Sequence, residues 1–301
     1  MGISGIQNRQ SYLKFVPHVK IQTGTNKKRW NKKEMSLSVI IPAFNASKYI
    51  EETLDSIRTQ TVQPKELIVV DDGSTDNTKQ LVEKYMDKHK YPINIYSMPT
   101  NKGIGATRQK GVELAKYEHV AFLSSDDVYA PNFIEKCLLQ LIPGVATFTS
   151  YHRCNSQLQP QTVFEPPKFS RESVIEWALK KNMYINFSTV IFPRNIFNKL
   201  HFKESLRHGE DLIFLLDTII SGLKYTLIDE PLLYYRIHNK AGSFVQDPTE
   251  FELVWFYLRD RLKVLGISDN FVQECYVVSK QRAFPSFQRK LASRVYHFLK
   301  A

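Results

Sequence analysis

Short apolar runs alternate with stretches of helical spacing through the first half of the chain. The runs lie at residues 37–41, 67–70, 93–97 and 120–123, and the helical stretches at 47–60, 75–90, 105–116 and 131–142. Near-continuous apolar runs of this length predict strands that are buried on both faces. Strands that alternate with helices predict a parallel sheet. We therefore expect an α/β fold with a mostly parallel sheet and helices on both of its faces.

The second half of the chain alternates less regularly. Its patterns predict strands at 145–149, 189–192, 225–228 and 232–236, a helix at 211–221, and helical structure from about residue 249 onward. The polar stretch 153–168 contains proline and is typical of a surface loop.

Composition limits the class of protein. The chain has 301 residues, of which 43% are hydrophobic, and this is enough for one large α/β domain with extensions. No run of eighteen apolar residues predicts a membrane-spanning helix, and the N-terminus has no signal-peptide pattern. The three cysteines are far apart and are typical of reduced thiols, so we expect a cytoplasmic protein.

The positive charge is concentrated at the two ends. The net charge is +11, but residues 1–35 carry +7 and residues 280–301 carry +6, so the remaining chain carries −2. This distribution argues against a nucleic-acid partner for the central region, and it favours ends that meet an anionic surface. Residues 1–35 are polar, basic and aperiodic, which predicts a flexible extension.

Residues 284–300 have the spacing of a basic amphipathic helix. The apolar residues recur at intervals of three and four, and basic residues occupy the other positions. Such a helix either lies on an anionic membrane surface or docks its apolar stripe on the central domain. We expect three parts: a basic extension at 1–35, a catalytic domain at 36–245 and a helical extension at 246–301. The membrane alternative places the protein at the inner face of the cytoplasmic membrane.

Polar residues follow three of the expected strands. Asn45 follows the first strand, Asp71 and Asp72 end the second, and Asp126 and Asp127 follow the run at 120–123. The carboxyl ends of strands in an α/β sheet are where such folds bind ligands. Two adjacent acids could hold Mg²⁺ or Mn²⁺ there, although a solvated turn would also explain them.

A glycine-containing loop, Asn101–Arg108, precedes the expected helix at 105–116. Such a loop allows a nucleotide to approach the backbone, and the following helix start favours anions. The loop matches neither the dinucleotide-binding fingerprint nor the Walker pattern.

Six segments in this order resemble the inverting nucleotide-sugar glycosyltransferases of family two, which have the GT-A fold. The segments are SVIIPAFNASKYIEETLDSIRTQT, ELIVVDDGSTDNT, NKGIGATRQKGVELA, VAFLSSDDVYAPNFI, GEDLIFLL and YYRIHNKAGSF. They cover roughly residues 36–245, and the ends of the chain match nothing in this pattern. The resemblance implies a non-processive enzyme, because the Gln-x-x-Arg-Trp motif of the membrane-embedded synthases is missing.

The resemblance also implies the residues that bind the donor. Asp72 would contact the base, which would be uracil. The nucleotide pocket would be lined by Pro42, Ala43 and Asn45, and Arg108 would lie beside the nucleotide.

The same resemblance implies a site for Mg²⁺ or Mn²⁺. Asp126 and Asp127 would hold the cation that bridges the diphosphate, and His238 would approach it as a loop folds over. The family usually has an acid where this chain has Ser124, so one carboxylate is missing. Ser125 would hydrogen-bond the ribose, and Arg236 would pair with the leaving diphosphate.

Asp211, in Gly209-Glu210-Asp211, would be the general base that accepts the proton of the acceptor hydroxyl. The alternative is that Glu210 and Asp211 only favour the start of a helix electrostatically. The implied reaction moves one sugar from a UDP-sugar to a hydroxyl of a glycan or lipid-linked acceptor during the synthesis of a surface polysaccharide such as lipopolysaccharide or capsule. A non-catalytic relative that binds nucleotide sugars is the alternative function.

Overall fold

The computed structural model describes residues 36–165, 186–238 and 247–266, together with residues 268–270, 272, 273, 276, 277 and 280. The predicted basic extension at 1–35 and the predicted amphipathic helix at 284–300 lie outside these residues. Within them, no helix combines the length and apolar character needed to cross a membrane.

The described strands form one nine-stranded sheet in the order β3-β2-β1-β4-β8-β6-β9-β5, with β7 paired to β6. Their bounds are β1 Leu37–Ala43, β2 Glu66–Asp71, β3 Asn94–Ser97, β4 His119–Phe122, β5 Val128–Tyr129, β6 Val145–Cys154, β7 Pro160–Phe164, β8 Val190–Pro193 and β9 Lys224–Arg236. Strands β3, β2, β1 and β4 run parallel, and the sheet continues through antiparallel pairs on both sides of β8. The predicted α/β fold is confirmed.

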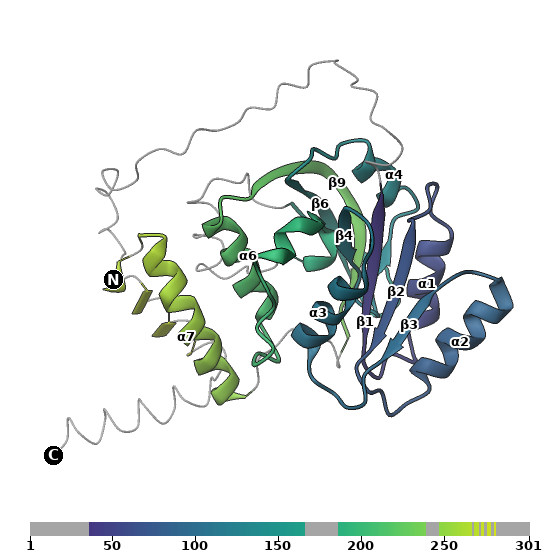
Figure 1. Cartoon of the computed structure of the whole chain (residues 1–301), viewed down its shortest axis with the longest axis horizontal. Coiled ribbons are helices and arrows are strands. Elements are labelled where there is room, and N and C mark those ends of the chain that lie inside the picture. The colour runs from purple at the N-terminus through teal and green to yellow at the C-terminus, as the bar shows by residue number, and fades with distance from the viewer. Residues whose placement is uncertain are drawn as a thin grey trace. The chain divides into compact units, whose positions relative to one another are not determined.

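The described helices lie on both faces of this sheet (Figure 1). Their bounds are α1 Ile50–Arg58, α2 Thr78–His89, α3 Ile104–Leu114, α4 Phe133–Leu138, α6 Glu210–Ile220 and α7 Pro248–Val264, with short 3₁₀ helices η1 Phe187–Thr189 and η2 Arg194–Asn198. The parallel strands β1, β2 and β4 are buried because helices cover both of their faces, which explains their continuous apolar sequences, whereas β3 at the edge is mostly exposed.

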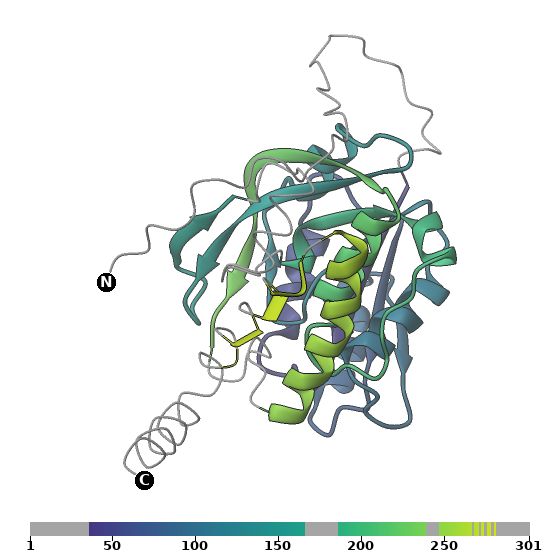
Figure 2. The ribbon, with the colours of Figure 1, turned by 90° about the vertical axis from the view of Figure 1, so that its left-hand side faces the viewer.

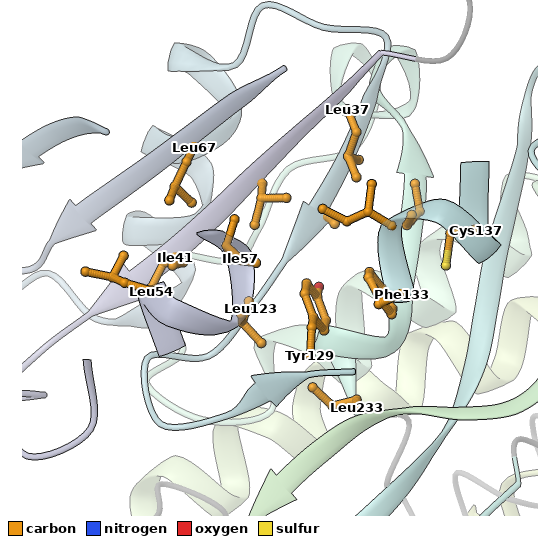
Figure 3. Packing of buried hydrophobic residues seen from close by; sticks show 14 of the residues in the cluster. Leu37, Ile41, Leu54, Ile57, Leu67, Leu123, Tyr129, Phe133, Cys137 and Leu233 are labelled. Carbon is orange, nitrogen blue, oxygen red and sulfur yellow. The ribbon is translucent and has the colours of Figure 1, made fainter. Parts of the chain in front are cut away.

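One face of the sheet packs against α1, α2 and α4. The apolar residues Ile50, Leu54 and Ile57 recur at helical spacing along α1, and all three are buried in this core. Figure 3 shows side chains of α1, β1 and α4 gathered in this core. The ring of Tyr129, in β5, stacks on the Phe133 ring of α4 with centroids 3.7 Å apart.

The other face packs against α3 and α6. A glycine at position 111 lets α3 approach β1 closely, because a Cβ atom there would lie 2.3 Å from Cγ2 of Ile40. Phe187, Phe202 and Phe214 stack or meet edge to face in this second core.

Helix α7 packs on α6 rather than standing apart from it (Figures 1 and 2). Leu212, Leu216, Trp255 and Leu258 lie in a third apolar core between the two helices. The guanidinium of Arg261 meets the carboxylate of Asp217 with two hydrogen bonds, of 2.6 and 2.8 Å. The described part of the expected helical extension is therefore packed onto the domain that contains α6.

Two segments differ from the expected elements. The stretch 153–168 was expected to be a loop, but β6 continues to Cys154 and pairs with β7 in an antiparallel hairpin. Strand β7 is an exposed edge strand, so it has no apolar pattern, and Pro160 at its first position is compatible with an edge. The two strands expected at 225–228 and 232–236 are one strand, β9, with irregular register opposite Thr149 and Ser150.

Candidate active site

The carboxyl ends of β1 and β2 are joined by backbone hydrogen bonds. The amide of Asp72 donates to the carbonyl of Ala43 at 2.8 Å. Asn45 has a positive φ of 49°, a conformation that asparagine adopts more readily than most residues. Its side-chain oxygen accepts hydrogen bonds from the amides of Thr75 and Asp76, at 2.8 and 3.3 Å. Asn45 therefore shapes the turn after β2, and Pro42 is buried behind it.

Asp72 connects the end of β2 to the start of α3. Its two carboxylate oxygens accept hydrogen bonds from the amides of Lys102 and Gly103, at 2.7 and 2.9 Å. The carboxylate is buried, and this burial raises its pKa, although the two backbone hydrogen bonds oppose the shift. Asp72 thus braces the glycine-containing loop.

Asp126 and His238 lie together at the end of β4, although they are far apart in the sequence. The Nε2 atom of His238 lies 2.9 Å from Oδ2 of Asp126. The side chain of Asp126 is 28% exposed and that of His238 is 14% exposed, so solvent and ligands can reach both groups. The ring of Tyr49 lies 5.0 Å from the His238 ring, between centroids. The predicted grouping of Asp126 with His238 is therefore present in the fold.

Asp127 does not share this exposure. Its side chain is fully buried, and Oδ1 accepts a hydrogen bond of 2.9 Å from the amide of Arg236. Burial, together with the neighbouring charge of Asp126, raises the pKa of Asp127 well above its usual value. In this structure the carboxyl of Asp127 ties β5 to β9, and its role as a metal ligand stays a prediction.

Arg236 is also buried, and its contact with the diphosphate stays a prediction. Its guanidinium donates to the carbonyl oxygens of Asp126 and Ser156, at 2.8 and 2.7 Å, and to the carboxylate of Glu52 at 2.6 Å. It also stacks over the ring of Tyr49, 4.2 Å from the centroid. With 2% of its side chain exposed, Arg236 is an anchor between β9, α1 and the Asp126 loop.

Ser124 occupies the position where the resembled family has an acid. Its hydroxyl lies 3.3 Å from the hydroxyl of Ser188, and its amide donates to the same oxygen at 3.1 Å. Ser188 is buried in η1, whereas Ser125 is partly exposed. The serine pair holds the loop before Asp126, so this position serves the backbone instead of supplying a carboxylate.

Arg108 forms a buried ion pair with Glu210 at the start of α6. Its guanidinium also lies over the ring of Phe187, 4.8 Å from the centroid. The guanidinium of Arg108 thus faces Glu210 and Phe187, and its predicted place beside the nucleotide stays a prediction. Asp211, the next residue after Glu210, is only partly buried in the first turn of α6. Of the two acids, Asp211 is therefore the one whose side chain a substrate can approach.

Residues 38–200 match the model of the family described as Glycosyl transferase family 2. The chain belongs to this family. Among curated relatives, TuaG of Bacillus subtilis (strain 168) is 29% identical over 248 residues, which cover 82% of this chain and 97% of TuaG. Its name assigns it to teichuronic acid biosynthesis as a glycosyltransferase. AmsB of Erwinia amylovora, named as an amylovoran biosynthesis glycosyltransferase, is 28% identical over 74% of this chain and 77% of its own length.

Solved structures of other proteins share the fold. A crystal structure of residues 1–349 of Staphylococcus aureus TarS in complex with UDP superposes with a TM-score of 0.59 and 25% identity, over 83% of this chain and 72% of that one. The glucosyl-3-phosphoglycerate synthase of Mycobacterium tuberculosis, solved with Mn²⁺, UDP and phosphoglyceric acid, superposes with a TM-score of 0.52 and 20% identity, over 78% of this chain and 80% of that one. The protein is therefore a family 2 glycosyltransferase with the GT-A fold, as its motifs implied.

The sequence did not predict the contacts that Arg108 and Arg236 make in this candidate site, nor the presence of Glu52 and Tyr49 there. Glu210 and Arg108 are 102 positions apart, and Glu52 and Arg236 are 184 apart, so no local pattern connects them. Tyr49 looks like an ordinary apolar position of the first helix. The sequence contains one indication of this ion pair. Arg108 lies among the buried positions of α3, and a buried arginine needs an acidic partner such as Glu210.

Proposed function

We propose that this protein is an inverting transferase that moves one sugar from a UDP-sugar to a hydroxyl of a glycan or lipid-linked acceptor. The observation that carries the proposal is the pair of Asp126 and His238, which places a carboxylate and an imidazole at the carboxyl end of β4 in a family 2 domain. Ligands of α/β sheets bind at such strand ends.

The pair fits a divalent cation. Carboxylate oxygen suits Mg²⁺ and Mn²⁺, and a neutral imidazole favours Mn²⁺. No set of three histidine, cysteine or acidic side chains is arranged for a metal among the described residues. Two protein ligands suit a cation whose other ligands are diphosphate oxygens and water. When bound, the cation would neutralise negative charge on the departing nucleoside diphosphate.

The remaining steps belong to side chains of this chain. Asp211 accepts the proton of the acceptor hydroxyl as the oxygen attacks the anomeric carbon from the face opposite the leaving group. One displacement of this kind inverts the configuration at that carbon and needs no covalent intermediate. Pro42 and Ala43, at the end of β1, and Asn45 after it border the nucleotide. Asp72 contacts its base, and Ser125 contacts its ribose.

We infer the pathway from the relatives. TuaG and AmsB are named for the biosynthesis of teichuronic acid and amylovoran, and TarS is named as a poly(ribitol-phosphate) β-N-acetylglucosaminyltransferase. All three names describe polymers or polymer modification, which supports the synthesis of a surface polysaccharide. A lipid-linked acceptor would place the enzyme at the inner face of the cytoplasmic membrane, where its basic ends meet anionic lipid.

The test begins with a panel of nucleotide sugars incubated with the purified protein and Mn²⁺, and UDP release is measured with and without EDTA. We expect one UDP-sugar to be consumed in the presence of the cation only. The variant Asp211→Asn should bind UDP with an unchanged Kd and lose about a thousandfold in turnover, as expected for loss of a general base.

Two results would contradict the proposal. Turnover retained by Asp211→Asn would remove the assignment of the base. UDP-sugar binding without turnover on any donor, in the wild-type protein, would favour the non-catalytic relative that Ser124 suggests.

A further inference from the structure

Arg108 and Glu210 form a buried ion pair outside the residues that touch the proposed substrates. Their side chains are 6% and 4% exposed, so solvent does not screen the interaction. The pair joins α3 to the first residue of α6. A buried pair of this kind adds little stability compared with apolar residues of similar volume. Its presence next to the proposed base therefore needs an explanation other than stability.

Neighbouring residues pack closely against both members of the ion pair. A Cβ atom at Gly105 would lie 3.4 Å from Cγ of Glu210 and 3.1 Å from the carbonyl oxygen of Lys203. The absence of a side chain at position 105 thus lets Glu210 lie close against α3. On the other side, the Phe187 ring lies under the Arg108 guanidinium. Both partners are held by their surroundings as well as by each other.

Helix α3 also contacts the proposed nucleotide site. The amides of Lys102 and Gly103, at its start, hold the carboxylate of Asp72. Arg108 lies in the second turn of the same helix, about 6–8 Å further along its axis from these residues. One rigid element therefore contacts the residue proposed to recognise the base and the residue that precedes the proposed general base.

A second set of contacts, through η1, connects the ion pair to the loop before Asp126. Phe187 packs on Arg108, and its neighbour Ser188 hydrogen-bonds the amide of Ser124 in the loop that leads to Asp126. The ion pair is therefore connected to Asp72 through α3, and to the loop before Asp126 through Phe187 and Ser188.

We propose that the Arg108–Glu210 ion pair positions Asp211 relative to the bound donor, by fixing the first turn of α6 to α3. This inference rests on the proposed function of Asp211 as the base. Glu210 and Arg108 are positioning residues, because neither is exposed to substrate. A displacement of the base by about 1 Å would cost up to about a hundredfold in turnover.

The test separates positioning from stability. In the variant R108M/E210M, two apolar side chains of similar length replace the ion pair, so the melting temperature should stay near that of the wild type. We expect kcat for sugar transfer to fall by about ten- to a hundredfold, while the Kd for UDP is unchanged. Recovery of wild-type kcat in this double variant would overturn the proposal.

Single variants keep the test valid if the double variant does not fold. Glu210→Gln can still accept a hydrogen bond from Arg108, so it should lose less of its kcat than Glu210→Ala. An equal loss of kcat in the two variants would show that the hydrogen bond to Arg108 is not what positions Asp211, and it would contradict the proposal.

A matched control is the ion pair that joins α7 to α6. Arg261→Met removes the partner of Asp217 about two turns away from Asp211, so it should lower the melting temperature and leave kcat unchanged. Asp211→Asn is measured in the same assay. If that variant stays active, the proposed function fails independently of the ion pair.

Discussion

Nε2 of His238 lies 2.9 Å from Oδ2 of Asp126, although 112 positions separate the two residues in the sequence. The contact joins the loop after β4 to the end of β9. Asp126→Asn should abolish Mn²⁺ binding in the presence of UDP, because it removes the anionic ligand, and His238→Ala should weaken binding by at least about tenfold. Titration of Mn²⁺ followed by electron paramagnetic resonance measures both effects.

The corresponding control is His201→Gln, which changes an exposed histidine outside the proposed site and leaves both proposed ligands in place. Unchanged Mn²⁺ affinity in Asp126→Asn would show that the cation binds elsewhere.

Arg236 should matter for stability more than its ionic partner does. Arg236→Met leaves the carbonyl oxygens of Asp126 and Ser156 without their donor, and we expect a loss of about 2–4 kcal/mol in the free energy of unfolding. Glu52→Gln should cost less than about 1 kcal/mol, because the Glu52 side chain is 55% exposed and solvent screens the ion pair. Denaturant unfolding of the two variants checks the difference, and equal losses would assign the stability to the charge pair alone.

His119 predicts how stability depends on pH. Burial lowers the pKa of its imidazole below the usual value, and a hydrogen bond to the Ser36 backbone only partly offsets this shift. The folded protein therefore favours the neutral ring. This contribution is fully present above the unfolded-state pKa of about 6.5, and it is lost as the pH falls toward the lower pKa of the folded state.

We expect the melting temperature of the wild type to fall between pH 7 and pH 5, and to fall less in His119→Gln. The exposed residue His201 provides the control, since His201→Gln should keep the wild-type slope. Parallel slopes for the wild type and His119→Gln would contradict the prediction.

Gly111→Ala tests the close packing of α3 on β1. Alanine is the better helix former, and at an exposed helical site this substitution would stabilise the protein by about 1 kcal/mol. Here the new Cβ would lie 2.3 Å from Cγ2 of Ile40, so we expect a loss of about 1–3 kcal/mol. The melting temperature measures the sign, and a more stable variant would show that α3 can move away from β1 freely.

Strands β1, β2 and β4 of the parallel half of the sheet could be predicted from the sequence because they are buried on both faces. Residues such as Val39, Ile40 and Ile41 must all be apolar there, and this requirement is visible without a structure. The hairpin of β6 and β7 could not be predicted in the same way. An exposed edge strand is held by backbone hydrogen bonds, which leave no mark on side-chain polarity.

The sequence by itself determined the family, and it predicted a site from Asn45, Asp72 and Asp126 after strands and from Asp211 at the start of a helix. These residues belong to short motifs whose order along the chain is informative. Only the tertiary structure decided which charged side chains are exposed. Asp126 is reachable and Asp127 is buried, and Asp211 is reachable while Glu210 is paired inside with Arg108. Neighbouring residues in a chain can point to opposite environments, and the burial and partner of each depend on elements that are distant in sequence.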